Sequence, residues 1–545
     1  MLCDKKEGPI MNEFSGERIL ILGAGVMQGP AISIARDLGL FTVVVDGDPN
    51  APEVSKADRF ECIDLKDKEG IADLGLSLQS NGGLGGIMTA GTDFSATVAW
   101  AAEKLGLPGI PYEAALNASD KDRMRRCFEA AGVPSPQFTV FTGETLKGKL
   151  PALPFSYPAV VKPVDNMGAR GCRRVDTPEE LTAALEDALG FSRSGRAIVE
   201  EYMDGPEFSV DAIVYKDEIH VCGFADRHIF FPPYFIEMGH TMPSNLGKKE
   251  TASLMEAFFA GIRALGISGG VGAAKGDLKL TPRGPMIGEI AARLSGGYMS
   301  GWTYPYASGV DLTRLAILTA MGRRPVNFGP LHHWTSAERA FISIPGKVRS
   351  IQGLDQARNT PLVKDVFLRA APSSLVRFPE NNVSKCGNVL SAAPDRGGAI
   401  AAAEGAACSV LIRLEAPNPE TAAFLTATAA FPPGAYTPDA AILAALNRLP
   451  DPPETHFLKL STINIIPFPE FTGSSLMDYM GRSPEESLEA VRSITGLALP
   501  IKDSGDTITL GRRFWAALIR GGYQGGAYFV DTINNQTEQG EGKKI

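Results

Sequence analysis

Residues 276–297 contain two acidic side chains and three basic ones, and four of these five suit one kind of chemistry. Asp277 and Glu289 are carboxylates of the type that hold Mg²⁺ against phosphate oxygens, and Lys279 and Arg293 are cations that bind phosphate or carboxylate groups. Two runs of alternating polarity around a Pro- and Gly-containing turn predict a β-hairpin. The polar side chains would then share one face, which indicates a metal and phosphate site. Charge on a solvated sheet face is the alternative.

Two further lysines stand where a phosphate contact would explain their positions. Lys121 lies in the first turn of an amphipathic helix, where its charge opposes the helix macrodipole. Lys162 ends an apolar strand and is followed by a glycine-containing loop over residues 165–171. This order suits a flap that closes over a triphosphate through backbone N–H groups, although the loop is no Walker A motif. At position 121 a solvent-facing lysine is the alternative.

A second acidic group ends a predicted strand over residues 197–203. Glu200, Glu201 and Met203 lie at its end, and Glu207 follows shortly after. The apolar neighbours of Glu200 suit an adenine slot, and Glu207 would accept hydrogen bonds from ribose hydroxyls. Taken alone, the segment also fits an edge strand with exposed acids.

Strands alternate with helices over residues 18–118, a pattern typical of a doubly wound parallel sheet. A glycine-rich turn over residues 23–30 connects the first strand to the first helix. Gln28 stands where the third Gly of G-x-G-x-x-G belongs, so the dinucleotide-binding signal is weak. An NAD(P)-dependent oxidoreductase is therefore kept only as an alternative.

Composition excludes several classes of protein. The chain of 545 residues carries a net charge of −9, which argues against a nucleic-acid-binding surface. Its seven cysteines are scattered, odd in number and without C-x-x-C, which fits reduced thiols in the cytoplasm better than disulfides or a zinc site. No apolar run reaches about 18 residues, so no membrane-spanning helix is expected.

Taken together, the order of these motifs resembles the ATP-grasp superfamily over residues 18–415. The resemblance implies a first α/β domain that binds no nucleotide, followed by two α+β lobes with ATP between them. The ATP contacts that it implies are Lys121, Lys162, Asn166, Gly168, Ala169, Gly171, Glu200, Glu201, Met203, Glu207 and Lys279. It also implies Mg²⁺, with Mn²⁺ as an alternative, on Asp277 and Glu289. Two positions depart from the family: many members have Glu where Asp277 stands and Asn where Ala291 stands.

Within the superfamily, three segments look like those of L-amino-acid (dipeptide) ligases and carnosine-synthase-like enzymes. They are residues 200–210, 235–244 and 289–297. In that group a Glu-x-x-His sequence corresponds to residues near the amino-acid substrates, which implies substrate contacts for Glu237 and His240.

The activity implied is that of an ADP-forming carboxylate–amine ligase. ATP phosphorylates a carboxylate, an amine attacks the acyl phosphate, and an amide, ADP and phosphate leave. Arg293 would be the catalytic residue that holds the acyl phosphate or the tetrahedral oxyanion. The backbone of Ser295, Gly296 and Gly297 would bind the substrate carboxylate, because glycine permits close approach.

The expected partners are small-molecule carboxylate and amine substrates, with no nucleic acid and no membrane, and a homo-oligomer is left open. Two alternatives also remain. One is a purine-pathway or carbamoyl-phosphate-type ATP-grasp ligase, and the other is a nucleotide-binding protein without turnover, which Ala291 keeps open.

The fold class expected is α/β and α+β multidomain, with an N-terminal doubly wound parallel sheet, a two-lobed ATP-grasp fold and C-terminal appendages. The expected parts are a flexible leader (1–17), an N-terminal α/β domain (18–118), a small lobe (119–196), a large lobe (197–325), a closing α/β module (326–415), a C-terminal extension (416–533) and a disordered tail (534–545). The extension is interpreted as a packing appendage in preference to an oligomerisation surface or a substrate lid.

Overall fold

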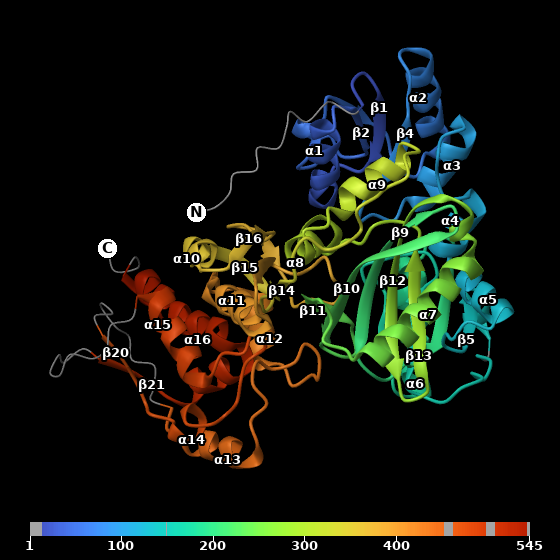
Figure 1. Ribbon diagram of the computed structural model, residues 1–545. Coiled ribbons are helices and arrows are strands. Elements are labelled where there is room, and N and C mark those ends of the chain that lie inside the picture. Colours follow the sequence, from blue (N-terminus) through green and yellow to red (C-terminus); the bar gives the residue numbers. More distant parts are fainter. Residues whose placement is uncertain (1–13, 149, 452–461, 497–506, 542–545) are drawn as a thin grey trace. The chain divides into compact units, whose positions relative to one another are not determined.

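The computed structural model describes residues 14–148, 150–451, 462–496 and 507–541 (Figure 1). The chain divides into two compact units. The first contains the chain up to Tyr234 together with residues 240–337 and 392–396, and the second contains residues 235–239, 338–391 and those from 397 onward.

A parallel sheet of four strands, in the order β3-β2-β1-β4, begins the first unit. Its strands are β1 (Arg18–Leu22), β2 (Phe41–Asp46), β3 (Arg59–Cys62) and β4 (Gly86–Thr89). The helices of this region are α1 (Gly29–Asp37), α2 (Lys68–Ser80), α3 (Ser95–Leu105) and α4 (Tyr112–Ser119). Four of the five residues of β1 and four of the six residues of β2 are buried, as a parallel sheet covered by helices on both faces requires. This confirms the predicted doubly wound parallel sheet.

The small lobe is an antiparallel sheet in the order β5-β8-β6-β7. Its elements are α5 (Lys121–Ala131), β5 (Phe138–Thr142), β6 (Ala159–Pro163), β7 (Arg173–Val175), α6 (Pro178–Phe191) and β8 (Arg196–Glu201). Because β8 is hydrogen-bonded on both sides within this sheet, the small lobe continues to Glu201, and the predicted boundary after residue 196 is wrong. Asp120 caps α5 by accepting the backbone N–H groups of residues 122 and 123.

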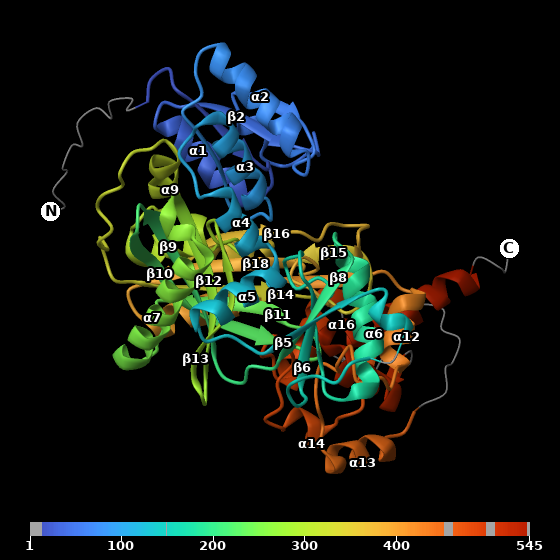
Figure 2. The ribbon, with the colours of Figure 1, turned by 90° about the vertical axis from the view of Figure 1, so that its right-hand side faces the viewer.

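The large lobe is built on long antiparallel strands in the order β13-β12-β9-β10-β11. Their bounds are β9 (Glu207–Tyr215), β10 (Glu218–Phe230), β11 (Ile236–Met242), β12 (Val271–Thr281) and β13 (Gly284–Ala291). Helix α7 (Lys248–Leu265) packs against one face of β12 and β13 through a buried apolar cluster (Figure 2). The predicted hairpin and its turn between Thr281 and Gly284 are confirmed.

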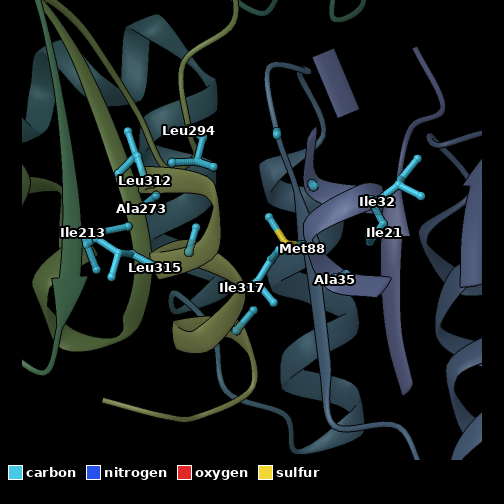
Figure 3. Packing of buried hydrophobic residues seen from close by; sticks show 14 of the residues in the cluster. Ile21, Ile32, Ala35, Met88, Ile213, Ala273, Leu294, Leu312, Leu315 and Ile317 are labelled. Carbon is cyan, nitrogen blue, oxygen red and sulfur yellow. The ribbon is translucent and has the colours of Figure 1, made fainter. Parts of the chain in front are cut away.

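One apolar cluster joins the N-terminal sheet to the large lobe (Figure 3). Helix α9 (Leu312–Ala320) lies in its middle, after the short helix α8 (Tyr304–Ser308). Phe14 is buried in this cluster, and its N–H donates to the carbonyl of Leu38 at 3.3 Å. Phe14 is therefore anchored by apolar burial and does not belong to a flexible leader, whereas residues 1–13 lie outside the described part of the chain.

The second unit begins with a closing module of two sheets. In the first sheet the strands follow the order β14-β18-β16, and in the second β15 lies between β17 and β19. The elements are β14 (Thr335–Phe341), β15 (Gly346–Gln352), α10 (Leu354–Asn359), β16 (Val363–Leu368), β17 (Leu375–Val376), β18 (Gly387–Ala393), α11 (Arg396–Ser409) and β19 (Leu411–Leu414).

Helices predominate in the C-terminal extension, which belongs to the same unit as the closing module. Its elements are α12 (Pro419–Thr426), α13 (Ala440–Arg448), β20 (Thr462–Ile465), α14 (Pro469–Thr472), α15 (Pro484–Thr495), β21 (Thr507–Leu510) and α16 (Arg512–Glu541). Helix α16 is assigned as far as Glu541, and the predicted disordered tail over residues 534–545 stays a prediction. Residues 542–545 lie outside the described part of the chain.

None of the helices in the described ranges combines the length and the apolar character needed to cross a membrane.

Candidate active site

Six side chains from three neighbouring strands share one face of the large-lobe sheet. They form two rows across β9, β12 and β13: Asp211–Lys275–Ala291 and Ser209–Asp277–Glu289. Side chains directly opposite one another in an antiparallel sheet project to the same side. The two carboxylates expected to hold metal, Asp277 and Glu289, are therefore direct cross-strand neighbours, as the hairpin prediction required.

A β-bulge at Gly288 makes this arrangement possible. Glu289 pairs with Asp277 and Ile287 pairs with Leu278, so Gly288 has no opposite residue. The extra residue restores the alternation of faces, and Glu289 faces the polar site while Ile287 is completely buried in the core. A guanidinium N–H of Arg125 donates to the carbonyl of Gly288 and holds the bulge in position.

Asp277 is engaged by two cations that the sequence analysis did not identify. Nη1 of Arg227 on β10 lies 2.9 Å from Oδ1 of Asp277, and Nζ of Lys275 forms an ion pair with Oδ2. Arg227 also pairs with Glu207, whose other oxygen lies 3.5 Å from Nζ of Lys279. Acidic and basic side chains thus alternate across this face of the sheet.

Glu289 is surrounded by positive charge. Nζ of Lys121 lies 3.7 Å from Oε2 of Glu289, and it also donates to the carbonyl of Asn166 at 2.8 Å. Burial would raise the pKa of Glu289, but Lys121, Lys275 and Lys162 lower it to about 2. Burial would lower the pKa of Lys121, but the Glu289 carboxylate raises it. Both groups are therefore ionised at neutral pH.

A buried ion-pair network lies behind these residues and joins α5, β6 and β8. Oε1 of Glu200 lies 2.9 Å from Nε of Arg125, and Oε2 lies 2.7 Å from Nζ of Lys162. Burial would raise the pKa of Glu200, but the two cations lower it. Arg125 follows Lys121 by four residues and shares a face of α5 with it, so the helical spacing in the sequence is a signal for Arg125.

The loop between β6 and β7 has a tightly wound backbone. Gly168, Ala169 and Gly171 have φ values of 69°, 60° and 63°, in the left-handed region that favours glycine. The side-chain amide of Asn166 donates to the carbonyl of Phe191 at 2.8 Å, which attaches the start of the loop to the end of α6. Of the predicted ATP contacts in this loop, Asn166 is thus held by its side-chain amide. Gly168, Ala169 and Gly171 have positive φ values and determine the path of the backbone.

The hairpin turn is attached to the end of β8. Nζ of Lys279 donates to the carbonyl of Met203 at 3.1 Å and lies 5.3 Å from the centre of the Tyr202 ring. Glu201 forms an ion pair with Arg283 in the turn. The structure therefore brings Glu201, Met203 and Lys279 close together, and their contact with ATP stays a prediction.

The residues after β13 approach the N-terminal sheet. Arg293 is 9% exposed, and its charge is close enough to help lower the pKa of Glu289. The N–H of Ser295 donates to Oδ1 of Asp211 at 3.0 Å. A Cβ at Gly91 would lie 3.1 Å from Cα of Gly296, so the glycine at position 91 permits this close approach, whereas a Cβ at Gly296 would make ordinary van der Waals contact. Gly297 has a φ of 61°.

Glu237 and His240 both lie on β11 and are buried. They belong to different units, so their pairing at a substrate stays a prediction. Within the second unit, the N–H of Glu237 donates to Oδ1 of Asn382 at 2.8 Å, and its carbonyl accepts from Nζ of Lys385 at 2.7 Å.

In the glycine-rich turn after β1, backbone N–H groups donate hydrogen bonds to side chains of the same protein. The N–H of Gly25 donates to Oε1 of Gln28 at 2.9 Å, and the N–H of Ala24 donates to Oδ2 of Asp46 at 2.8 Å. The N–H groups that would bind a pyrophosphate in a dinucleotide site therefore have internal partners.

The donor set suits Mg²⁺ bound together with a nucleotide. In the ranges that the structure describes, no group of three or more His, Cys, Asp or Glu side chains is arranged as a metal site. Asp277 and Glu289 offer two carboxylates, and Mg²⁺ is commonly bound by one or two carboxylates with substrate phosphates and water.

Three family models match successive parts of the chain. They are the ATP-grasp N-terminal domain over residues 32–109, the ATP-grasp domain over residues 155–301 and the L-amino acid ligase C-terminal domain 2 over residues 340–415.

Individual relatives agree with these matches. The uncharacterized protein y4rH of Sinorhizobium fredii is 26% identical over 375 residues, which are 68% of this chain and 77% of that protein. Carnosine synthase 1 of Gallus gallus is 28% identical over 339 residues, which are 57% of this chain and 36% of that enzyme. The chain thus spans well under half of the carnosine synthase that it matches.

Solved structures share the fold. The L-amino acid ligase from Bacillus licheniformis aligns with a TM-score of 0.63 at 21% identity and covers 74% of this chain and 99% of that one. Phosphoribosylglycinamide synthetase from Anaerococcus prevotii aligns with a TM-score of 0.57 at 20% identity, covering 73% and 100%.

Proposed function

Because the chain belongs to the ATP-grasp superfamily and carries an L-amino acid ligase C-terminal domain, we propose that it joins the carboxylate of an amino acid to an amine while converting ATP to ADP. The observation that carries this proposal is the pair of opposed carboxylates, Asp277 and Glu289, set among lysines and arginines on one sheet face. A triphosphate with its metal ion has the charge pattern that such a face accepts.

In this scheme each of the two lysines of the small lobe is ion-paired with a different carboxylate. Lys121 and Lys162 would bind phosphate oxygens, and each is held in place by a carboxylate, Glu289 or Glu200. Glu200 then acts mainly as a positioning residue, because both of its oxygens already accept from cations. Mg²⁺ on Asp277 and Glu289, when bound, would neutralise charge on the transferring phosphoryl group.

The substrate acid would lie beyond the phosphates, near the close approach of Gly296 and residue 91. There the guanidinium of Arg293 would hold the acyl phosphate or the oxyanion formed when the amine attacks. Its fixed charge and paired donors suit a planar oxyanion better than a lysine would. Small-molecule acid and amine substrates are the partners that this scheme needs.

Release of ADP from Mg²⁺-ATP, measured with a panel of amino-acid pairs, tests the proposal. We expect turnover with at least one pair and none with Glu289→Gln, because a neutral amide weakens Mg²⁺ binding. Calorimetry with ATP and with NAD(H) on the same protein separates the ligase from the oxidoreductase alternative. Binding of nicotinamide cofactor without binding of ATP would refute the ligase, and turnover only with phosphorylated substrates would favour the purine-pathway alternative.

A further inference from the structure

Lys275 is a nearly buried cation beside the two carboxylates of the site. It lies in the row Asp211–Lys275–Ala291, directly beside the row that contains the two carboxylates. Its side chain is only 12% exposed, and its ammonium is ion-paired with Oδ2 of Asp277. A cation thus lies against the carboxylate from the side of the first row.

The residue opposite Lys275 on β13 makes room for this side chain. Ala291 carries only a methyl group and is buried. The other neighbour in the row, Asp211, accepts the N–H of Ser295 through one of its oxygens. A second divalent cation on this side would therefore find no oxygen from position 291 and would compete with the Lys275 ammonium for Asp277.

Most of the lone-pair sites of the Asp277 carboxylate already have a hydrogen-bond donor. A carboxylate offers about four lone-pair sites. Arg227 and the hydroxyl of Ser209 approach Oδ1 at 2.9 Å and 3.3 Å, and Lys275 takes one site on Oδ2. One site is left, which is enough for a single metal ion shared with Glu289 and phosphate oxygens.

From this geometry, and resting on the ligase function proposed above, we propose that the ammonium of Lys275 takes the place of a second divalent cation. The nucleotide complex then contains one metal ion, between Asp277 and Glu289, and Lys275 supplies the remaining positive charge toward the phosphates. Substitution of the lysine, together with an oxygen ligand at position 291, should recreate a second metal position.

Equilibrium dialysis with Mn²⁺ and a non-hydrolysable ATP analogue measures the ratio of bound metal to bound nucleotide. For the unchanged chain we expect about one Mn²⁺ per bound analogue, since only one position has carboxylates from both strands. Ala291→Asn alone should keep that ratio, because Lys275 still occupies the position. The double variant Lys275→Met with Ala291→Asn should bring the ratio to about two, because an amide oxygen is a suitable ligand for a hard cation.

Lys249→Met is the matched control, because Lys249 is exposed in the first turn of α7. It should leave the ratio unchanged. A ratio of two in the unchanged chain, or a ratio of one in the double variant, would overturn the inference and leave the ligase proposal intact. Failure of every variant and of the unchanged chain to bind the ATP analogue would instead contradict the ligase proposal. If the double variant does not fold, the ratios of the unchanged chain and of Ala291→Asn still decide the question.

Discussion

Substitution of Arg125 by Met removes one cation from the buried network and keeps an unbranched apolar stem in place of the guanidinium. Arg125 is completely buried with Nε 2.9 Å from Glu200, which would be left with Lys162 alone. Removal of one partner from a buried ion pair costs about 3–5 kcal/mol. The neighbouring Arg126 is a matched control, because its pair with Asp122 is at the surface, where such pairs contribute about 0.3–0.5 kcal/mol.

Urea unfolding of both variants, followed by amide hydrogen exchange in α5 and β8, measures the difference in local stability. We expect a large loss for Arg125→Met and almost none for Arg126→Met. The affinity for ATP should also fall about tenfold, or about 1.4 kcal/mol, in Arg125→Met, because Glu200 then attracts Lys162 more strongly away from phosphate. Equal losses of stability in the two variants would refute the assignment of Glu200 as a charge held by two cations.

Three other changes have expected outcomes. Arg293→Ala should lower kcat by about 10²–10³-fold and leave ATP affinity unchanged in calorimetry, since the guanidinium would act on the acyl group. Burial raises the pKa of Asp211 from 3.8 to about 6, so the folded state binds this proton more tightly. Stability should therefore fall as pH rises through this interval, by up to about 3 kcal/mol, and thermal unfolding of Asp211→Asn should lack the fall. Arg413→Met should destabilise the second unit by about 3–5 kcal/mol in urea unfolding, because its partner Asp531 is 1% exposed.

The parts of the fold that local patterns determine were predictable. The turn between β12 and β13 has Pro and Gly at positions that favour a tight reversal, and the hairpin follows from it. The apolar runs of β1 and β2 specify a buried parallel sheet. The sheet to which β8 belongs was not predictable in this way, because sequence spacing does not say which distant strand will pair with it.

The same distinction applies to the site. Asp277 and Glu289 were found because both lie on one hairpin, whereas Arg227 reaches Asp277 only through the pairing of β10 with β9 and of β9 with β12. No local pattern contains that register. The bulge at Gly288 was partly predictable. A strict alternation over β13 would place the apolar Ile287 and the charged Glu289 on the same face of the sheet. This conflict of polarity was a signal in the sequence.

The C-terminal extension has a structural role that follows from its hydrogen bonds to the closing module. Gln524 of α16 accepts the N–H of Ile344 at 3.1 Å and donates to the carbonyl of Ile412 at 3.1 Å, and the hydroxyl of Tyr523 accepts the N–H of Ile412 at 2.8 Å. All three bonds are buried, and a buried backbone group left without a partner costs about 1–3 kcal/mol. A lid would have to break these bonds each time it opened. We therefore infer that α16 is a permanent part of the core of the second unit.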